Sequence, residues 1–209
     1  PATLGPIPTR LKVLAAQEAK DTGSKEKYVW SYQMPGRKEG ESPVVRSLLS
    51  KDELISFVDP DVHTLYDNFR RGVEKFGNTN CLGHRPTATS PYVWRTFNEV
   101  MEEATLVGSA LASFEADRHV GICSINRPEW VIAEQAVNAY SMTLVPLYDT
   151  FGEESLCFII NQSGMEVVFA HPDRVELIFR CVASSPSLKT VISLGDDISK
   201  HEGKVPAGI

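Results

Sequence analysis

The 209-residue sequence lacks the short motifs that mark the commonest catalytic and metal sites. It has neither Gly-x-Gly-x-x-Gly nor Gly-x-x-x-x-Gly-Lys-Ser/Thr, so no phosphate-binding loop of either kind is predicted. Its histidines show no metal-ligand spacing and no neighbouring nucleophile: His63, His84, His119, His171 and His201. A zinc site and a Ser-His or Cys-His hydrolase therefore have no support, and spacing predicts no catalytic residue and no metal ligand.

Cysteine is scarce and widely spaced. The four cysteines, Cys81, Cys123, Cys157 and Cys181, form no Cys-x-x-Cys pair. Cys123 and Cys157 fall in apolar runs, where a free cysteine behaves as a small hydrophobic residue. We therefore expect reduced cysteines without a disulfide framework, as is typical of a reducing compartment.

Long apolar runs and an excess of basic residues are also missing. No stretch approaches the roughly 18 apolar residues that a membrane-spanning helix needs, and the amino-terminal residues lack the apolar segment of a signal peptide. The net charge of −6 argues against a nucleic-acid partner, because phosphate backbones are bound by clustered Lys and Arg. We expect a protein that is not secreted and has no transmembrane segment, although peripheral association with a membrane stays open.

Apolar strands alternate with helices in the second half of the chain. Strands are predicted at 119–125, 143–148, 166–171 and 189–194, and helices at 128–141, 152–163 and 173–184. The strands are apolar on both faces, as in a parallel sheet that is covered by helices on both sides. The fold class is therefore predicted to be α/β, with a doubly wound, mostly parallel sheet and flanking helices.

The first half of the chain divides into two regions. Residues 1–58 are predicted to be an irregular amino-terminal extension, because prolines and a polar run break any sustained helix before residue 43. From Thr64, a plausible N-cap, an amphipathic helix is predicted to reach Gly77, and a second helix follows a strand at 92–96. We expect both helices to pack on the sheet within an α/β subdomain of residues 59–197, with residues 198–209 as a linker.

Candidate ligand contacts follow the first two predicted strands, at the carboxyl edge where open α/β sheets bind ligands. They are Asn126, Arg127, Glu129, Trp130, Tyr148 and Asp149. A helix N-terminus with an adjacent arginine could hold an anion. His84 and Arg85, in a separate predicted loop, could likewise face a phosphorylated ligand or simply be solvated.

A purely structural interpretation of the same residues is favoured locally. Asn126 would cap the helix, Pro128 would start it, Glu129 would face the helix dipole and Trp130 would fill the core. Asp149 would neutralise Arg127 across the strand ends. Capping pairs are also predicted between Thr150 and Glu153 and between Asp173 and Glu176.

Several short sequence segments, by their order along the chain and their spacing, carry a resemblance to a known family. They are Leu-Tyr-Asp-Asn-Phe at 65–69, Cys-Leu-Gly at 81–83, the aromatic strand near Trp94, Asn-Arg-Pro-Glu-Trp at 126–130, Ala-Tyr-Ser at 139–141 and Val-Pro-Leu-Tyr-Asp-Thr at 145–150. Together they resemble the amino-terminal part of long-chain acyl-CoA synthetases, the fatty-acid-activating ligases of the adenylate-forming superfamily. The resemblance implies the large amino-terminal, AMP-binding domain of such an enzyme.

The resemblance also implies an activity. Such enzymes use ATP and Mg²⁺ to convert a long-chain fatty acid to an acyl-adenylate, and CoA then displaces AMP to give the thioester. The Ser/Thr/Gly-rich phosphate loop and the catalytic lysine of the family are absent from this sequence, so we expect the fragment alone to be inactive. Cytoplasmic, peroxisomal and peripheral endoplasmic-reticulum forms are all compatible with it, and residues 1–58 could add contacts to a homodimer.

Two other interpretations stay open. The chain could be a stand-alone module that binds acyl chains, CoA or a protein partner without catalysis. A generic receiver-like or flavodoxin-like domain is a weaker alternative, because no acidic pocket or phosphate-binding loop accompanies the strands.

Overall fold

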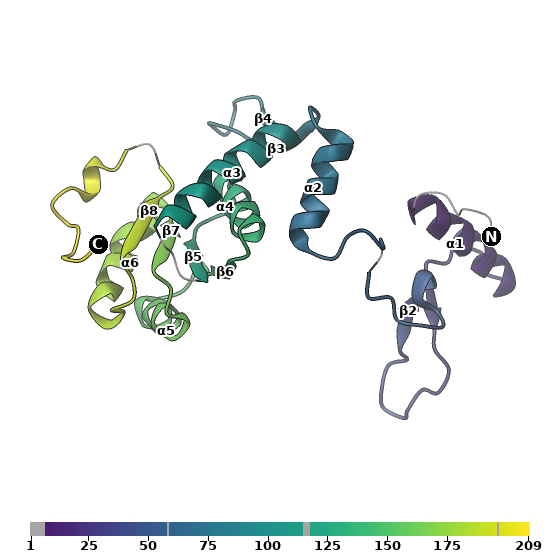
Figure 1. Ribbon diagram of the computed structural model, residues 1–209. Helices are drawn as coiled ribbons and strands as arrows, with labels where there is room; N and C mark the ends of the chain where they lie inside the picture. Colours follow the sequence, from purple (N-terminus) through teal and green to yellow (C-terminus); the bar gives the residue numbers. More distant parts are fainter. Residues whose placement is uncertain (1–6, 58, 115–117, 196) are drawn as a thin grey trace. The chain divides into compact units, whose positions relative to one another are not determined.

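The computed structural model describes residues 7–57, 59–114, 118–195 and 197–209 (Figure 1). The chain divides into two compact units, Pro1–Pro60 and Asp61–Ile209. Within the described ranges, no helix is both long and apolar enough to cross a bilayer.

The first unit contains a helix that the sequence did not predict. Helix α1 covers Ile7–Asp21, and strand β1 (Ser31–Gln33) pairs antiparallel with β2 (Val45–Ser47), which leads into the 3-10 turn η1 (Leu48–Ser50). The expectation of no sustained helix is wrong because Pro8 lies in the first turn, where a backbone N–H has no intrahelical partner to lose.

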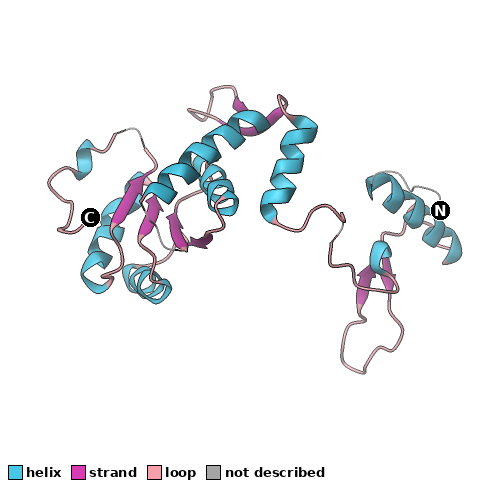
Figure 2. Cartoon of the chain, viewed as in Figure 1, coloured by secondary structure: helices cyan, strands magenta, loops and turns pink. Residues whose placement is uncertain are grey.

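The second unit is built on a four-stranded parallel sheet. Its strands are β5 (His119–Cys123), β6 (Thr143–Pro146), β7 (Val167–Ala170) and β8 (Thr190–Ser193), in the spatial order β6-β5-β7-β8 (Figure 2). Gly121 on β5 lies opposite Val145 on one neighbour and Val168 on the other. The predicted strands and the doubly wound parallel arrangement are confirmed.

Helices cover both faces of this sheet. The strand side chains pack alternately into two cores, one with α3 (Phe97–Ser113) and α4 (Pro128–Ala139), the other with α5 (Glu153–Ser163) and α6 (Val175–Cys181). On β7, Val167 and Phe169 enter the first core, and Val168 and Ala170 enter the second. This alternation explains why the strand is apolar along its whole length. The short turns η2 (Pro172–Arg174) and η3 (Val182–Ser184) flank α6.

Capping boxes define the first two helices of the second unit. Thr64 Oγ1 accepts a hydrogen bond from the Asp67 N–H at 3.0 Å, and Asp67 Oδ2 accepts one from the Thr64 N–H at 3.1 Å. Helix α2 (Leu65–Phe76) thus begins after Thr64 and ends before Gly77, as predicted. The hydrogen bonds from Thr64 hold the pKa of Asp67 below its ordinary value. Thr96 and Glu99 form the equivalent box on α3.

Helix α2 lies outside the sheet layers. It has no buried residue and contacts α3 and α4, with the Phe69 and Phe97 rings 6.1 Å apart. The expectation that both early helices pack on the sheet is therefore wrong for α2, because α3 and α4 already cover that face. Between α2 and α3 runs an antiparallel hairpin of β3 (Asn80–His84) and β4 (Val93–Thr96).

The two capping pairs predicted further along the chain are wrong. Helix α5 begins after Gly152 without a side-chain cap, and the Glu153 carboxylate instead binds Arg180 Nε on α6 at 2.6 Å. Before α6, His171 Nδ1 accepts the hydrogen bond from the Asp173 N–H. All three acidic residues of these predicted pairs, Glu153, Asp173 and Glu176, form tertiary ion pairs instead.

The last residues pack onto α6. Lys200 Nζ binds Asp173 at 3.1 Å and Lys204 Nζ binds Glu176 at 2.6 Å, and these bonds lower the pKa of both carboxyl groups. His201, in the 3-10 turn η4 (Ser199–His201), is buried with its ring edge-on to Phe179.

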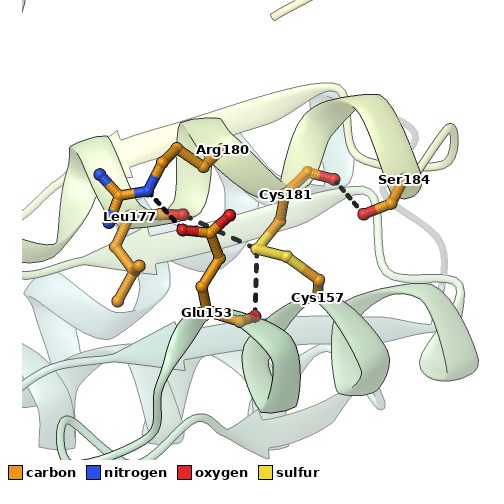
Figure 3. The surroundings of a disulfide bond; sticks show 6 residues. All are labelled: Glu153, Cys157, Leu177, Arg180, Cys181 and Ser184. Atoms are coloured by element: carbon orange, nitrogen blue, oxygen red, sulfur yellow. Dashed lines mark hydrogen bonds and ion pairs between the residues drawn. A yellow bond between two sulfur atoms is a disulfide. The ribbon is translucent and has the colours of Figure 1, made fainter.

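A disulfide joins Cys157 on α5 to Cys181 on α6, with the two Cα atoms 4.8 Å apart (Figure 3). The expectation of reduced cysteines is therefore wrong for this pair. Sequence spacing did not reveal it because the two helices lie side by side on one face of the sheet, which only the crossover through β7 produces. Cys81 and Cys123 are free, and burial raises the pKa of both thiols.

The close approach of α3 and α4 predicts an unusual response at Gly108. A Cβ there would collide with the Tyr140 ring, so we expect Gly108→Ala to lower the free energy of unfolding by about 1–3 kcal/mol. Helix propensity alone would raise it by about 1 kcal/mol. Urea denaturation distinguishes the two signs, with the exposed Glu102→Ala on the same helix as control. A stabilised Gly108→Ala protein would contradict the close packing.

The disulfide predicts a redox-dependent stability. Without reductant, Cys157→Ser should unfold with about 3 kcal/mol less stability, because the cross-link closes a loop with a sequence separation of 24. Cys81→Ser, which removes a free thiol, is the control. Dithiothreitol should abolish the difference in Tm between wild type and Cys157→Ser; a difference that survives reduction would refute the cross-link.

Candidate functional site

The order of the strands creates a gap at the carboxyl edge of the sheet. The chain passes from β5 through α4 to β6, and then returns through α5 to β7 on the other side of β5. The connection that leaves β5 runs toward β6, whereas the connection that leaves β7 runs through α6 toward β8, in the opposite direction. Strands β5 and β7 therefore flank the topological switch point where doubly wound sheets bind ligands. Backbone bonds from His171 N to Cys123 O and from Leu147 N to Ile122 O fix the segments that leave the strands.

The larger hollow at this edge is a cleft of about 910 Å³ between the β3–β4 hairpin and the start of α4. Its polar lining comes from both elements: His84, Arg85, Arg95, Asn126, Arg127 and Glu129. We call it the arginine cleft. Three of the predicted site residues, Asn126, Arg127 and Glu129, line this cleft. His84 and Arg85, which the sequence placed in a separate loop, line it as well.

A second hollow of about 340 Å³ adjoins the first and shares Asn126 with it. Trp130, Tyr148 and Asp149 line it, and we call it the aromatic pocket. The Tyr148 ring is exposed and meets Phe151 edge-on at 5.3 Å. The structure therefore brings all of the predicted site residues to two neighbouring hollows at one edge of the sheet.

Glu129 is the centre of the charge network in the arginine cleft. Arg127 Nε donates to Glu129 Oε2 at 2.6 Å, and Arg95 Nη2 lies 3.8 Å from Glu129 Oε1. Burial opposes ionisation of Glu129, but the hydrogen bond and charge of Arg127 outweigh it and lower the pKa of the carboxyl group. Arg95 also donates from Nε to Glu103 at 2.9 Å.

This network corrects one expectation from the sequence. Arg127 pairs with Glu129 rather than with Asp149, because both residues of the pair lie in the same turn at the start of α4. Asp149 instead faces the aromatic pocket, where its charge helps burial to raise the pKa of the nearby Cys123 thiol.

The start of α4 has no side-chain cap. Arg127 occupies the N-cap position without a capping hydrogen bond, so the expectation that Asn126 caps the helix is wrong. Pro128 lies in the first turn, as predicted. Trp130 packs partly against the core with α3 and also lines the aromatic pocket, so its structural and ligand-facing roles are compatible.

Arg95 is the residue of the cleft that the sequence interpretation missed. It lies on β4, more than thirty residues before Arg127, and only the packing of the hairpin beside α4 joins the two. In the sequence, Arg95 could have been recognised as a candidate because it is the one charged residue of the apolar and aromatic strand segment Tyr92-Val-Trp-Arg95.

A resident metal ion does not fit this edge of the sheet. Among the described residues, no group of three or more His, Cys, Asp or Glu side chains could hold one. Glu129 is occupied by two arginines, which leaves Asp149 as the remaining acidic group of the two hollows. The two hollows therefore offer, among the described residues, no set of ligands for a resident metal ion.

An open, doubly wound parallel sheet with hollows at its carboxyl edge is the architecture of α/β domains in which ligands generally bind at a topological switch point. The sequence model described as AMP-binding enzyme matches residues 69–207, and the chain belongs to this family.

Curated relatives agree with this family. The chain is 40% identical over 153 residues to long-chain-fatty-acid–CoA ligase 1 of Homo sapiens, covering 70% of the chain and 22% of the relative. It is 33% identical over 176 residues to the peroxisomal long chain acyl-CoA synthetase 7 of Arabidopsis thaliana, covering 81% and 25%. The chain thus spans about a quarter of the length of these relatives. The resemblance predicted from the sequence is confirmed.

Solved structures share the fold at lower identity. A long-chain-fatty-acid-CoA ligase from Archaeoglobus fulgidus superposes with a TM-score of 0.59 at 22% identity, over 71% of this chain and 30% of that one. An anthranilate CoA ligase in complex with anthranoyl-AMP gives 0.59 at 21% identity, over 68% and 27%.

The network around Glu129 predicts a pH-dependent stability. Because the folded pKa lies below the ordinary 4.5, the ion pairs stabilise the fold above that pH, and the contribution is lost as pH falls through the folded pKa. At pH 7, Glu129→Gln should be less stable by up to about 1 kcal/mol, since the partly exposed pairs are screened by solvent. Urea denaturation at pH 7 and pH 3 measures this, with exposed Glu102→Gln as control. An equal deficit at both pH values would contradict the assignment.

Proposed function

We propose that this chain is the amino-terminal portion of an ATP-dependent long-chain fatty acid:CoA ligase. The observation that carries the proposal is the 40% identity to long-chain-fatty-acid–CoA ligase 1 over 70% of this chain. The match of the AMP-binding family to residues 69–207 supports the same adenylate-forming chemistry.

The proposed reaction has two balanced steps. The fatty-acid carboxylate attacks the α-phosphorus of ATP, which forms an acyl-adenylate and releases diphosphate. The CoA thiol then attacks the acyl carbon, which forms the thioester, releases AMP and gives up the thiol proton. Mg²⁺ would accompany the nucleotide and offset its negative charge, as metal ions generally do in such transfers.

The residues of this chain would bind and orient a substrate or cofactor rather than catalyse the reaction. Trp130 and Tyr148 offer apolar ring surface at the aromatic pocket, and Asn126 and Asp149 offer hydrogen-bonding groups beside it. Arg127, held by Glu129, places a positive charge at the start of α4. These residues are proposed contacts for a substrate or cofactor, and no residue of the chain is assigned to the chemical step itself.

The chain alone is proposed to be inactive. It covers about a quarter of its relatives, and its sequence holds no glycine-rich phosphate loop. The complete ligase would act in the cytoplasm, in peroxisomes or at the surface of the endoplasmic reticulum, and residues 1–58 would contribute to a homodimer. A relative with a peroxisomal name supports one of these locations.

A stand-alone binding module is the second candidate. It is favoured by the fact that both hollows are lined entirely by residues 82–195, so they need no other segment to form. In this alternative the chain would bind acyl chains or CoA, or a protein partner, without turnover.

The size of the native product separates the two candidates. An antibody raised against residues 60–197 should detect a band several-fold heavier than 23.1 kDa in source cells. The purified native product should form AMP from ATP only when fatty acid and CoA are supplied, whereas the isolated chain should form none. Turnover by the isolated chain would overturn its proposed inactivity, and a native band at 23.1 kDa would favour the binding module.

A further inference from the structure

A small cavity lies beside α6 and β8, near the carboxyl-terminal residues of the chain (Figure 1). Its volume is about 250 Å³, and it shares no described lining residue with the arginine cleft or the aromatic pocket. We call it the His201 cavity. Most of its lining side chains are apolar: Val175, Phe179, Val191, Ile198 and Val205.

His201 is the most deeply buried polar residue of this cavity. It is 5% exposed, and both of its ring nitrogens are buried without a hydrogen-bond partner among the described residues. The nearest carboxylate oxygen, Glu176 Oε1, lies 3.7 Å from Nδ1, which is beyond hydrogen-bond distance. A neutral imidazole ring has one donor and one acceptor nitrogen, and burying both unpaired is costly. His201 is therefore suited to bind a polar group inside the cavity.

Ser193 adds a second unpaired polar atom to the same cavity. Its Oγ atom is buried without a hydrogen-bond partner in the part of the chain that the structure describes. Because side chains alternate along a strand, Ser193 shares with Val191 the face of β8 that turns toward α6, whereas Ile192 packs in the opposite core. A serine thus occupies a position where the pattern of the sheet favours an apolar residue.

Two large apolar side chains border the cavity and remain open to solvent. Ile198 is 59% exposed and Val205 is 53% exposed, and both line the cavity. A single exposed apolar side chain is common on protein surfaces. Here, however, two of them adjoin buried polar atoms that lack partners, so a ligand with an apolar body and one polar group would satisfy both features.

The charge of the lining restricts the class of ligand. Glu202 is the charged residue among the described lining residues. Lys200 and Lys204 lie in the same segment but are bound to carboxylates outside the cavity. A carboxylate or phosphate would therefore meet a like charge without a compensating cation. A neutral hydroxyl group avoids this repulsion, and it can both donate and accept a hydrogen bond.

We propose that the His201 cavity binds a small neutral alcohol or phenol of about seven to ten non-hydrogen atoms, since a cavity of about 150 Å³ already holds a benzene molecule. The hydroxyl group would bind between His201 and Ser193, and the apolar body would lie against the surrounding walls. The exposed side chains of Ile198 and Val205 would move to admit it. This proposal rests on the cavity and does not depend on the proposed ligase function, whose fatty acid, ATP and CoA are all anionic.

NMR titration of the isotopically labelled chain with hexanol, phenol and hexanoate tests the proposal. Hexanol or phenol should shift the signals of the His201 ring and of Ser193, with a Kd on the order of 1 mM. Hexanoate has the same chain length but carries a negative charge, and it should bind about tenfold more weakly or less. The ring signals of His84, which lies in the arginine cleft, should not move.

Two substitutions test the roles of the lining residues. Ser193→Ala removes the hydroxyl group but keeps the cavity, and should weaken binding of the alcohol about threefold to tenfold. Ile198→Ala shortens an exposed wall and should weaken binding about threefold or more. Leu106→Ala is the matched control, because Leu106 is 66% exposed on α3, outside the cavity, and its loss should leave the affinity unchanged. Circular dichroism checks that each variant is folded.

Saturable binding of either alcohol that both substitutions weaken supports the site. A preference for phenol or for hexanol then identifies the ligand class as aromatic or aliphatic. If neither alcohol binds, water alone satisfies His201 and Ser193, and the proposal is overturned. Equal affinity for hexanoate, or equal weakening by Ile198→Ala and Leu106→Ala, overturns it as well. These titrations involve no turnover, so ligase activity of the native product stands or falls separately.

Discussion

Burial of the parallel sheet on both faces is the constraint on which the second unit depends. Val167 and Phe169 on β7 point into one core while Val168 and Ala170 point into the other, and all four are buried. Burying an aliphatic or aromatic side chain of this kind stabilises a fold by about 1.5–3 kcal/mol. A central strand with no polar face must be covered by helices on both faces of the sheet. Because crossovers are right-handed, helices reach both faces only when some crossovers run in one direction along the sheet and others run in the opposite direction.

The site at the sheet edge follows from those crossovers. Because the chain leaves β5 toward β6 and leaves β7 toward β8, the segments at the carboxyl ends of β5 and β7 diverge and leave a gap. The β3–β4 hairpin forms one wall of the arginine cleft, and the start of α4 forms the other. Helix α4 holds Trp130, and the segment that follows β6 holds Tyr148 and Asp149, around the adjoining pocket.

Polar interactions in the second unit have a different role from the apolar cores. The pairs of Glu153 with Arg180 and of Glu176 with Lys204 join elements at the surface, where each contributes little to stability. The disulfide between α5 and α6 acts on the same layer by restricting the unfolded chain. Around Glu129, by contrast, the pairs orient two arginines toward a cleft, so the geometry of the charges matters more than their contribution to stability.

The sequence by itself determined the strands and helices of the parallel sheet in the second unit, and the family. Apolar runs marked the strands, Thr64 and Gly77 marked the limits of α2, and Asn-Arg-Pro-Glu-Trp at 126–130 carried the resemblance that the comparisons confirm. These features are local, since they depend on residues within a turn or a strand of one another. The tertiary structure decided the rest. It joined Cys157 to Cys181, and it brought Arg95 on β4 to the cleft and to Glu129 on α4. Contacts between segments distant in sequence depend on how the helices pack across the sheet, and no local pattern encodes that packing.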